Sequence, residues 1–224
     1  MGGSARLDHS LDFPHMTGVL LDRPAAVTRA RRLNRFSLGW NVTEAVVALL
    51  AGVAAGSISL IGFGLDSVVE VMASVALAWR LSREGDGCTQ PDDRRATRMV
   101  AASFAALGAY VAVEAVRDLA AGHHPEASTV GVVLAIVSLL VMPWLARAKR
   151  RLAPVLGSQA QAAEADQTAL CALLSAVLLV GLVANAALGW WWADAVAGLA
   201  IAALALRAAV HTWRAESLAD TCCH

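Results

Sequence analysis

The sequence predicts an all-α integral membrane protein with six transmembrane helices and with its N and C termini in the cytoplasm. Three observations support this fold class. Hydrophobic residues make up 58% of the 224 residues and charged residues only 16%, whereas a soluble domain usually carries about 25% charge. Apolar runs long enough to cross a bilayer core of about 30 Å recur along the chain. Basic residues are confined almost entirely to alternate connections between these runs.

The apolar runs give six predicted helices in chain order. Their ranges are 36–55, 58–79, 99–120, 129–145, 158–188 and 190–212. A short break at Gly56 and Ser57 separates the first helix from the second. We therefore expect residues 1–30 to form a cytoplasmic N-terminal tail, residues 31–214 a six-helix transmembrane transporter domain, and residues 215–224 a short cytoplasmic C-terminal tail.

The basic residues predict how the helices are oriented. Of the 18 Lys and Arg, all except Arg117 lie before the first helix, between the second and third, between the fourth and fifth, or at the end of the sixth. The segment 147–151 places Lys149 and its neighbouring arginines in the connection after the fourth helix. Because cytoplasmic loops are enriched in Lys and Arg, this side is predicted to be cytoplasmic, in a multi-pass protein of the cell membrane. The formal net charge is zero, so we expect no nucleic-acid partner. The apolar runs predict that the helices are surrounded by a lipid bilayer.

Two acidic residues lie within the second predicted helix. Asp66 and Glu70 are four residues apart, so their carboxylates share one helix face, about 6 Å apart along the axis. Carboxylates this close in a low-dielectric interior repel each other unless a cation or a shared proton neutralises them. This pattern predicts a site that exchanges a divalent cation for protons. The alternative is one protonated acid that is hydrogen-bonded between helices.

The fifth predicted helix carries a polar pair at the same spacing. Gln167 and Cys171 lie four residues apart, with Cys171 near the middle of the span. A thiolate binds zinc and other soft metals, and an amide oxygen is a weaker, harder ligand. Taken alone, Cys171 is more typical of a small core residue. The acid pair at similar depth in the second helix favours a ligand role, which makes Asp66, Glu70, Gln167 and Cys171 the candidate metal ligands.

Further polar residues lie toward the cytoplasmic halves of the helices. The candidates for a cation pathway are Asn41, Glu44, Glu164 and Asp166. Asn41 and Glu44 have the alternative of bonding the second helix. Asp194, at the outer end of the sixth helix, is expected to be solvated at the membrane interface. Small residues around the acid pair predict close helix packing; they are Gly62, Gly64, Ser67 and Ser74.

Three sequence stretches resemble the cation diffusion facilitator superfamily. They are residues 56–60 (GSISL) leading to 66–70 (DSVVE), the loop with Pro125 and Glu126, and residues 189–199 (GWWWADAVAGL). The resemblance implies six helices, a homodimer, and export of divalent metal by proton antiport. The helix-five metal pair of that family, commonly His and Asp, falls on Gln167 and Cys171.

The chain departs from the family pattern at its C-terminal end. Only residues 213–224 follow the last predicted helix, so the resemblance implies a small divergent branch without the C-terminal cytoplasmic metal-binding domain of the family. The final Cys222, Cys223 and His224 are either a flexible tail with a chance cluster or a capture site for thiophilic metal.

The leading functional hypothesis is a proton-coupled exporter that moves Zn²⁺ or a similar transition metal out of the cytoplasm. Fe²⁺, Mn²⁺, Co²⁺ and Cd²⁺ are also compatible with these ligands, and no prosthetic group is expected. The alternative is a non-transporting membrane protein of the same fold, either metal-responsive or an assembly subunit. A membrane enzyme with Cys171 as nucleophile is disfavoured because the fifth helix offers no histidine base, so we expect a protein that is not an enzyme.

Overall fold

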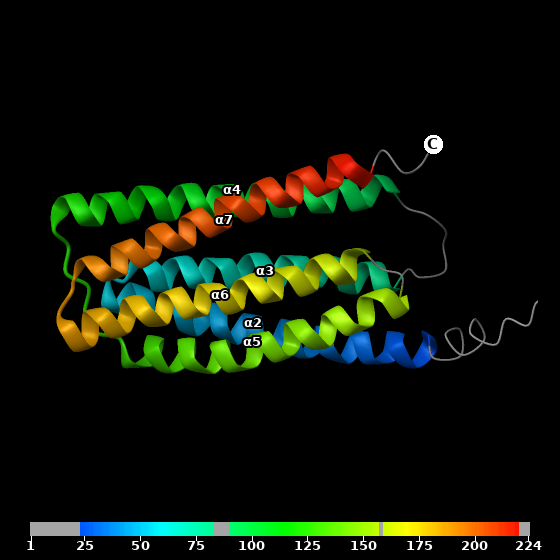
Figure 1. The fold of residues 1–224 in the computed structure, drawn as a ribbon, viewed down its shortest axis with the longest axis horizontal. Helices are drawn as coiled ribbons and strands as arrows, with labels where there is room; N and C mark the ends of the chain where they lie inside the picture. Colours follow the sequence, from blue (N-terminus) through cyan, green and yellow to red (C-terminus); the bar gives the residue numbers. More distant parts are fainter. Residues whose placement is uncertain (1–22, 83–89, 157–158, 220–224) are drawn as a thin grey trace, which may run out of the picture.

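The computed structural model describes residues 23–82, 90–156 and 159–219. These ranges hold six helices and no strand (Figure 1). The helices are α2 (Arg23–Ala55), α3 (Ile58–Ser82), α4 (Gln90–Ala121), α5 (Thr129–Leu156), α6 (Gln159–Leu188) and α7 (Trp192–Ala219). Each is long and apolar enough to cross a membrane, so the predicted six-helix, all-α membrane fold is confirmed. The terminal residues Cys222, Cys223 and His224 lie outside the described residues.

Four helices extend well beyond their predicted ranges: α4 begins at Gln90 and α7 ends at Ala219, and α2 and α5 differ most. The first was expected to begin at Phe36, but α2 begins at Arg23. The fourth was expected to end at Leu145, but α5 continues to Leu156. The charge of residues 147–151 predicts a loop, but these residues are helical. The buried residues of α5 keep a spacing of three to four, from Met142 through Lys149 to Leu156. Charge alone did not end this helix.

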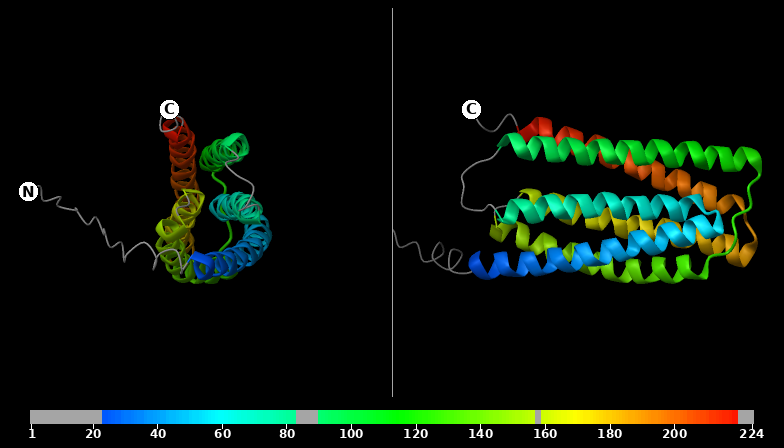
Figure 2. Two further views of the ribbon diagram at one scale, coloured as in Figure 1. Left: turned by 90° about the vertical axis from the view of Figure 1, so that its right-hand side faces the viewer. Right: turned by 180° about the vertical axis from the view of Figure 1, so that it is seen from behind.

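The helices pack in three close pairs. The helix α4 lies against α7, α5 against α6, and α2 against α3. The pair α4–α7 projects to one side of the other four helices, as the end-on view in Figure 2 shows. The helix α3 also contacts α4, α6 and α7, and it is the most buried of the six spans. The helix that carries the acid pair is therefore the one most completely surrounded by protein.

Small residues allow α3 to approach its neighbours closely. A Cβ atom on Gly64 would lie 2.9 Å from Cγ of Leu49 in α2, and one on Gly62 would lie 3.0 Å from Cγ2 of Val111 in α4. These distances leave no room for a side chain. The packing role predicted for the glycines near the acid pair is therefore confirmed.

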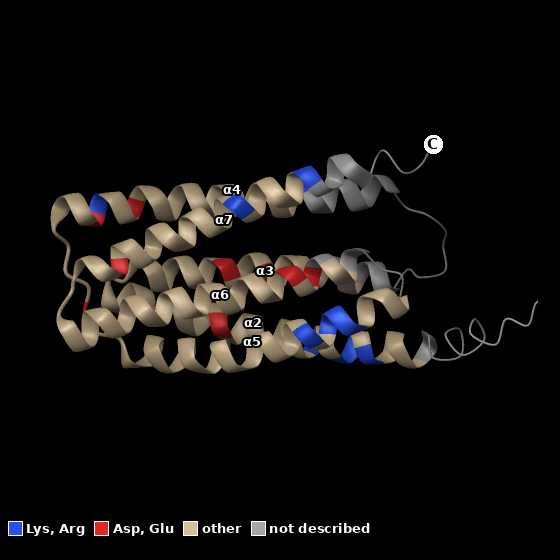
Figure 3. Ribbon diagram, viewed as in Figure 1, with Lys and Arg blue, Asp and Glu red and all other residues tan. Residues whose placement is uncertain are grey.

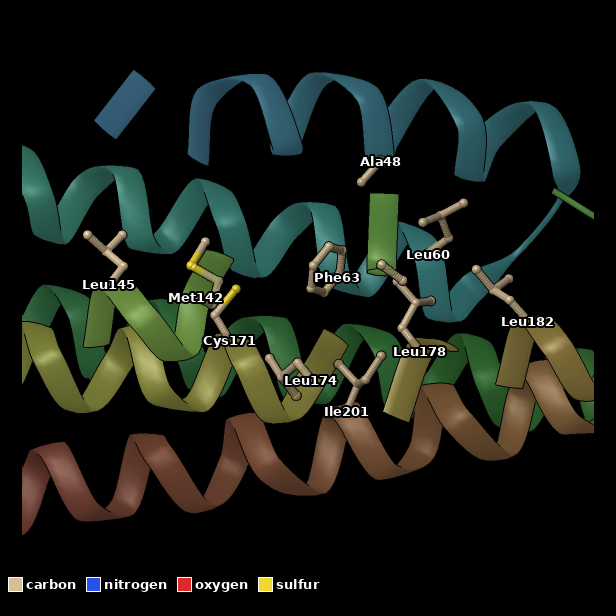
Figure 4. Packing of buried hydrophobic residues seen from close by; sticks show 11 residues of the cluster. Ala48, Leu60, Phe63, Met142, Leu145, Cys171, Leu174, Leu178, Leu182 and Ile201 are labelled. Atoms are coloured by element: carbon tan, nitrogen blue, oxygen red, sulfur yellow. The ribbon is translucent and has the colours of Figure 1, made fainter. Parts of the chain in front are cut away.

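The apolar surface and the apolar core occupy separate faces of the helices. Large hydrophobic side chains such as Leu50, Leu140 and Val180 are about 70% exposed, as expected of side chains that face lipid. A buried cluster runs between α2, α3, α5, α6 and α7 (Figure 4). Cys171 lies within this cluster, close to Met142 of α5 in the figure.

The two ends of the bundle differ in charge and in turn chemistry. Lys and Arg gather toward the end where α2 begins and α7 ends (Figure 3). At the opposite end, glycines follow α2, α4 and α6 with positive φ angles of 62°, 64° and 66° at Gly56, Gly122 and Gly189. Glycine adopts this left-handed conformation without steric cost and is the usual residue just after a helix. The predicted break at Gly56 is thus confirmed as a tight turn.

Candidate cation site

The site is built on one face of α3. Asp66, Glu70 and Ser74 follow one another at four-residue intervals, and all three are buried, with exposures of 3%, 3% and 0%. Because four residues of helix rise about 6 Å, these groups form a row along the helix axis. Figure 3 shows the acidic residues of α3 within the bundle, away from its two ends.

The helix α6 faces this row with a buried polar stripe of its own. The stripe consists of Glu164, Thr168, Cys171 and Ser175. The Thr168 hydroxyl donates a hydrogen bond of 2.8 Å to Oε1 of Glu70. Gln167, the predicted ligand, is only partly buried beside it. The structure thus brings Cys171 and Thr168 to the row, while Gln167 lies at its border and its ligand role stays a prediction.

The helix α2 contributes a third acid to the row. Glu44 is 1% exposed, and its Oε2 accepts a hydrogen bond of 2.9 Å from the Ser67 hydroxyl of α3. The Cys171 thiol of α6 donates to the same oxygen at 3.7 Å. Asp66 lies close enough to Glu44 and Glu70 to interact with both electrostatically. Three carboxylates from two helices, with a thiol from a third, therefore share one buried region.

A buried lysine lies at the end of the row nearest Ser74. Lys149 of α5 is fully buried and its Nζ donates to Ser37 Oγ, Glu164 Oε1 and Thr168 Oγ1 at 2.7, 3.1 and 3.0 Å. The Ser74 hydroxyl also donates to Glu164 Oε1, at 2.8 Å. The sequence prediction that placed Lys149 in a connection between two helices is wrong, because Lys149 lies within α5. The three-to-four-residue spacing of Lys149 from Met142 and Leu145 was the signal that could have found it.

Several buried oxygens of the row lack a hydrogen-bond partner among the described residues. They are Oε1 of Glu44, Oε2 of Glu70, Oε2 of Glu164 and Oδ1 of Asn41. Buried polar atoms are nearly always hydrogen-bonded in native proteins. Unpartnered carboxylate oxygens in one region are the groups that a cation or a proton would satisfy. The predicted pathway residues Asn41, Glu44 and Glu164 are thus brought to the same buried region as Glu70.

The described residues do not form a closed metal shell. Among them, no three or more His, Cys, Asp or Glu side chains converge in a way that would hold a metal ion. Asp166, the remaining pathway candidate, is exposed on α6 and forms an ion pair with Arg150, so the structure does not bring it to the row. The arrangement is a line of separate acids between helices.

The end of the bundle where α3 and α7 begin holds a second polar cluster. Asp194 of α7 is 1% exposed, so its predicted solvation at the interface is wrong. Its carboxylate accepts hydrogen bonds from the hydroxyls of Ser57 and Ser59. Ser57 immediately precedes α3, and its hydroxyl accepts a bond from the Leu60 N–H at 3.2 Å, as a helix cap does. Asp194 therefore ties the start of α7 to the start of α3.

The comparison with known families concerns the second half of the chain. A family model described as a cation efflux transmembrane domain matches residues 96–218, just over half of the chain. The match covers α4 to α7, apart from the first residues of α4 and the last of α7, and includes Cys171 and Lys149; the Asp66 and Glu70 pair of α3 precedes it. A search of curated proteins found no match. The chain therefore belongs to the cation efflux family, whose members are multi-pass membrane transporters of divalent cations.

Proposed function

We propose that this chain is a proton-coupled exporter of divalent transition metals, with Zn²⁺ as the first candidate substrate. The observation that carries the proposal is the row of buried acids formed by Glu44, Asp66 and Glu70. An ionisable group inside a bilayer costs several kcal/mol unless it faces a partner or water. Three such groups in one region, two with oxygens that lack a partner among the described residues, are best explained by a cation that they bind and release.

The proposed ligands are Asp66 and Glu70 from α3 with Gln167 and Cys171 from α6. The thiol contact with Glu44 supports Cys171 as a group that faces the acids. Thr168, which faces Glu70, and Gln167 are adjacent in sequence, so they lie about 100° apart around the helix. A rotation of α6 about its axis would exchange them. We infer that cation binding draws the separate groups together through such a movement, as alternating access requires.

Protons provide the coupling. In the absence of a cation, neighbouring carboxylates in a low-dielectric interior are neutralised by protons, because several negative charges at this spacing repel one another. A metal binds to deprotonated ligands, so loading releases protons. Release of the metal on the far side would let protons return to Asp66 and Glu70. One cycle therefore exchanges metal for protons.

The charge asymmetry of the bundle indicates from which side the cation would enter. The positive-inside rule favours the basic end (Figure 3) as the cytoplasmic side, and we therefore expect both termini in the cytoplasm. We also expect the protein to lie in the cell membrane. We expect Asn41, Glu44 and Glu164 to line the entry path to the acid pair, with Asp166 at its rim. We further expect a homodimer, as the family resemblance implies.

The proposal is tested by metal flux in proteoliposomes with an imposed pH gradient. Zn²⁺, Mn²⁺, Fe²⁺ and Co²⁺ are compared, and the double variant Asp66→Ala with Glu70→Ala is compared with the wild type. We expect gradient-dependent flux of at least one metal in the wild type and background flux in the double variant. Glu126→Gln, which changes an exposed acid of an outer loop, is the matched control and should keep wild-type flux. Intact flux in the double variant would remove Asp66 and Glu70 from the site.

A non-transporting member of the fold is the second candidate. The observation in its favour is that the described residues hold no converged group of three metal ligands, while Lys149 already supplies a positive charge to Glu164. This alternative predicts metal binding or assembly without flux under any gradient. The same proteoliposome experiment separates the two candidates.

A further inference from the structure

The ammonium group of Lys149 is surrounded by oxygen atoms from three side chains. Its side chain is 0% exposed, and its ammonium group has three N–H donors. Each finds an oxygen acceptor on a different residue: Ser37 of α2, Glu164 of α6 and Thr168 of α6. These three oxygens, one of which belongs to a carboxylate, satisfy all three N–H donors of Lys149, and we call them the oxygen cage.

The cage is connected directly to the acid row. The Thr168 oxygen accepts from Lys149 at 3.0 Å and lies 2.8 Å from Glu70 Oε1 and 3.0 Å from the carbonyl oxygen of Glu164. A hydroxyl has only one proton, so Thr168 donates either to Glu70 or to the backbone of its own helix. The ammonium group of Lys149 and the carboxylate of Glu70 are thus joined through a single hydroxyl.

We propose that this cage, made by Ser37, Glu164 and Thr168, is a second cation site that the protein fills with its own Lys149 ammonium. Hydroxyl and carboxylate oxygens are the ligands that hard cations prefer. With Lys149 in place, Glu164 has its counter-ion, so it can line the entry path without retaining a cation. The transported cation is then confined to the neighbouring site at Asp66 and Glu70. The inference rests on the proposed function only for these last two statements.

An ordinary structural ion pair makes a different prediction. If Lys149 and Glu164 only stabilise the contact between α5 and α6, neutralising Lys149 weakens the fold and adds no cation binding. If the cage is a cation site, the same change frees it for a mobile cation. The count of bound cations therefore separates the two explanations.

The experiment measures Mn²⁺ binding to the purified full-length chain in nanodiscs by isothermal titration, with Mn²⁺ alone as the probe. Mn²⁺ is a hard cation, and its free fraction can also be counted by electron paramagnetic resonance. Lys149→Gln should bind an additional Mn²⁺ per chain relative to the wild type, and Lys149→Arg should not. The double variant Lys149→Gln with Glu164→Gln should return to the wild-type count, because the carboxylate of the cage is gone.

An unchanged count in folded Lys149→Gln would overturn the proposal, as would a gain that persists in the double variant. If Lys149→Gln does not fold in cation-free buffer, the folded fraction of the variant is measured with and without added Mn²⁺. Recovery of folding by Mn²⁺, absent from the double variant, supports the cage; no recovery overturns it. The comparison is made relative to the wild type, so it holds even if Asp66 and Glu70 bind no metal and the proposed function fails.

Discussion

Removal of the Asp194 carboxylate should loosen the end of the bundle where α3 and α7 begin. In Asp194→Ala, the hydroxyls of Ser57 and Ser59 lose their shared acceptor, and all three residues are buried. A hydrogen bond to a charged group contributes roughly 1.5–3 kcal/mol net. The third contact, from the Ser59 N–H, is long at 3.4 Å and adds little. Loss of the two hydroxyl bonds should lower the free energy of unfolding by about 3–6 kcal/mol.

The assay is reversible unfolding in detergent micelles for the wild type, Asp194→Ala and Asp194→Asn. The asparagine retains an acceptor oxygen without the charge, so its loss should be about half as large. Glu126→Ala, in an exposed loop, should change the free energy of unfolding by less than about 0.5 kcal/mol. A loss of less than about 1 kcal/mol in Asp194→Ala would refute the assignment of Asp194 as the link between α3 and α7.

Three further predictions follow from the packing and from the site. Gly181→Ala should lower the free energy of unfolding by about 1–3 kcal/mol, because its Cβ would lie 2.5 Å from Cβ of Ala197. Gly39→Ala, whose Cβ would meet nothing within 4 Å, should not lower it. Equal losses of unfolding free energy in the two variants would contradict the close packing at Gly181. Cys171→Ser should reduce Zn²⁺ flux about tenfold more than Mn²⁺ flux, because the thiolate is the soft ligand; equal losses in the proteoliposome assay would exclude the thiol as a ligand. Glu44→Gln should reduce flux about tenfold or more, because it removes a carboxylate that can ionise when the cation is present. Wild-type flux would place Glu44 outside the pathway.

The helices could be predicted because membrane burial leaves a strong record in composition. Each span needs about 20 apolar residues, and the turns are marked by glycines such as Gly56 and Gly189. The acid pair was visible for the converse reason, since Asp66 and Glu70 interrupt an apolar span. Both signals are local in the sequence.

The parts that the sequence did not reveal depend on which way a side chain faces. Lys149 has three arginines within two residues of it, and only the helical period of α5 turns it inward to Glu164. Asp194 is buried because two serines from another helix supply its hydrogen bonds. Such partners are distant in sequence, so neither composition nor charge counting could identify them.

On α6, the residue that contacts Glu70 is Thr168 and not the predicted Gln167. Counting by four from Cys171 gives Gln167, whereas the buried face of α6 passes through Glu164, Thr168 and Cys171, spaced four and three apart. A helix has 3.6 residues per turn, so Gln167 and Thr168 lie on opposite sides of the Cys171 position, about 100° apart. The contact with Glu70 distinguishes them in this conformation, and it belongs to Thr168.

Anomalous X-ray scattering at the zinc edge from crystals soaked in Zn²⁺ would test the proposed site most directly. We predict a peak between the carboxylates of Asp66 and Glu70, with Zn–O distances of about 2.0–2.2 Å and the Cys171 sulfur at about 2.3 Å. The peak should be absent from the Asp66→Ala and Glu70→Ala double variant. A peak that lies elsewhere in the bundle, with both carboxylates unbound, would contradict the assignment of this row as the cation site.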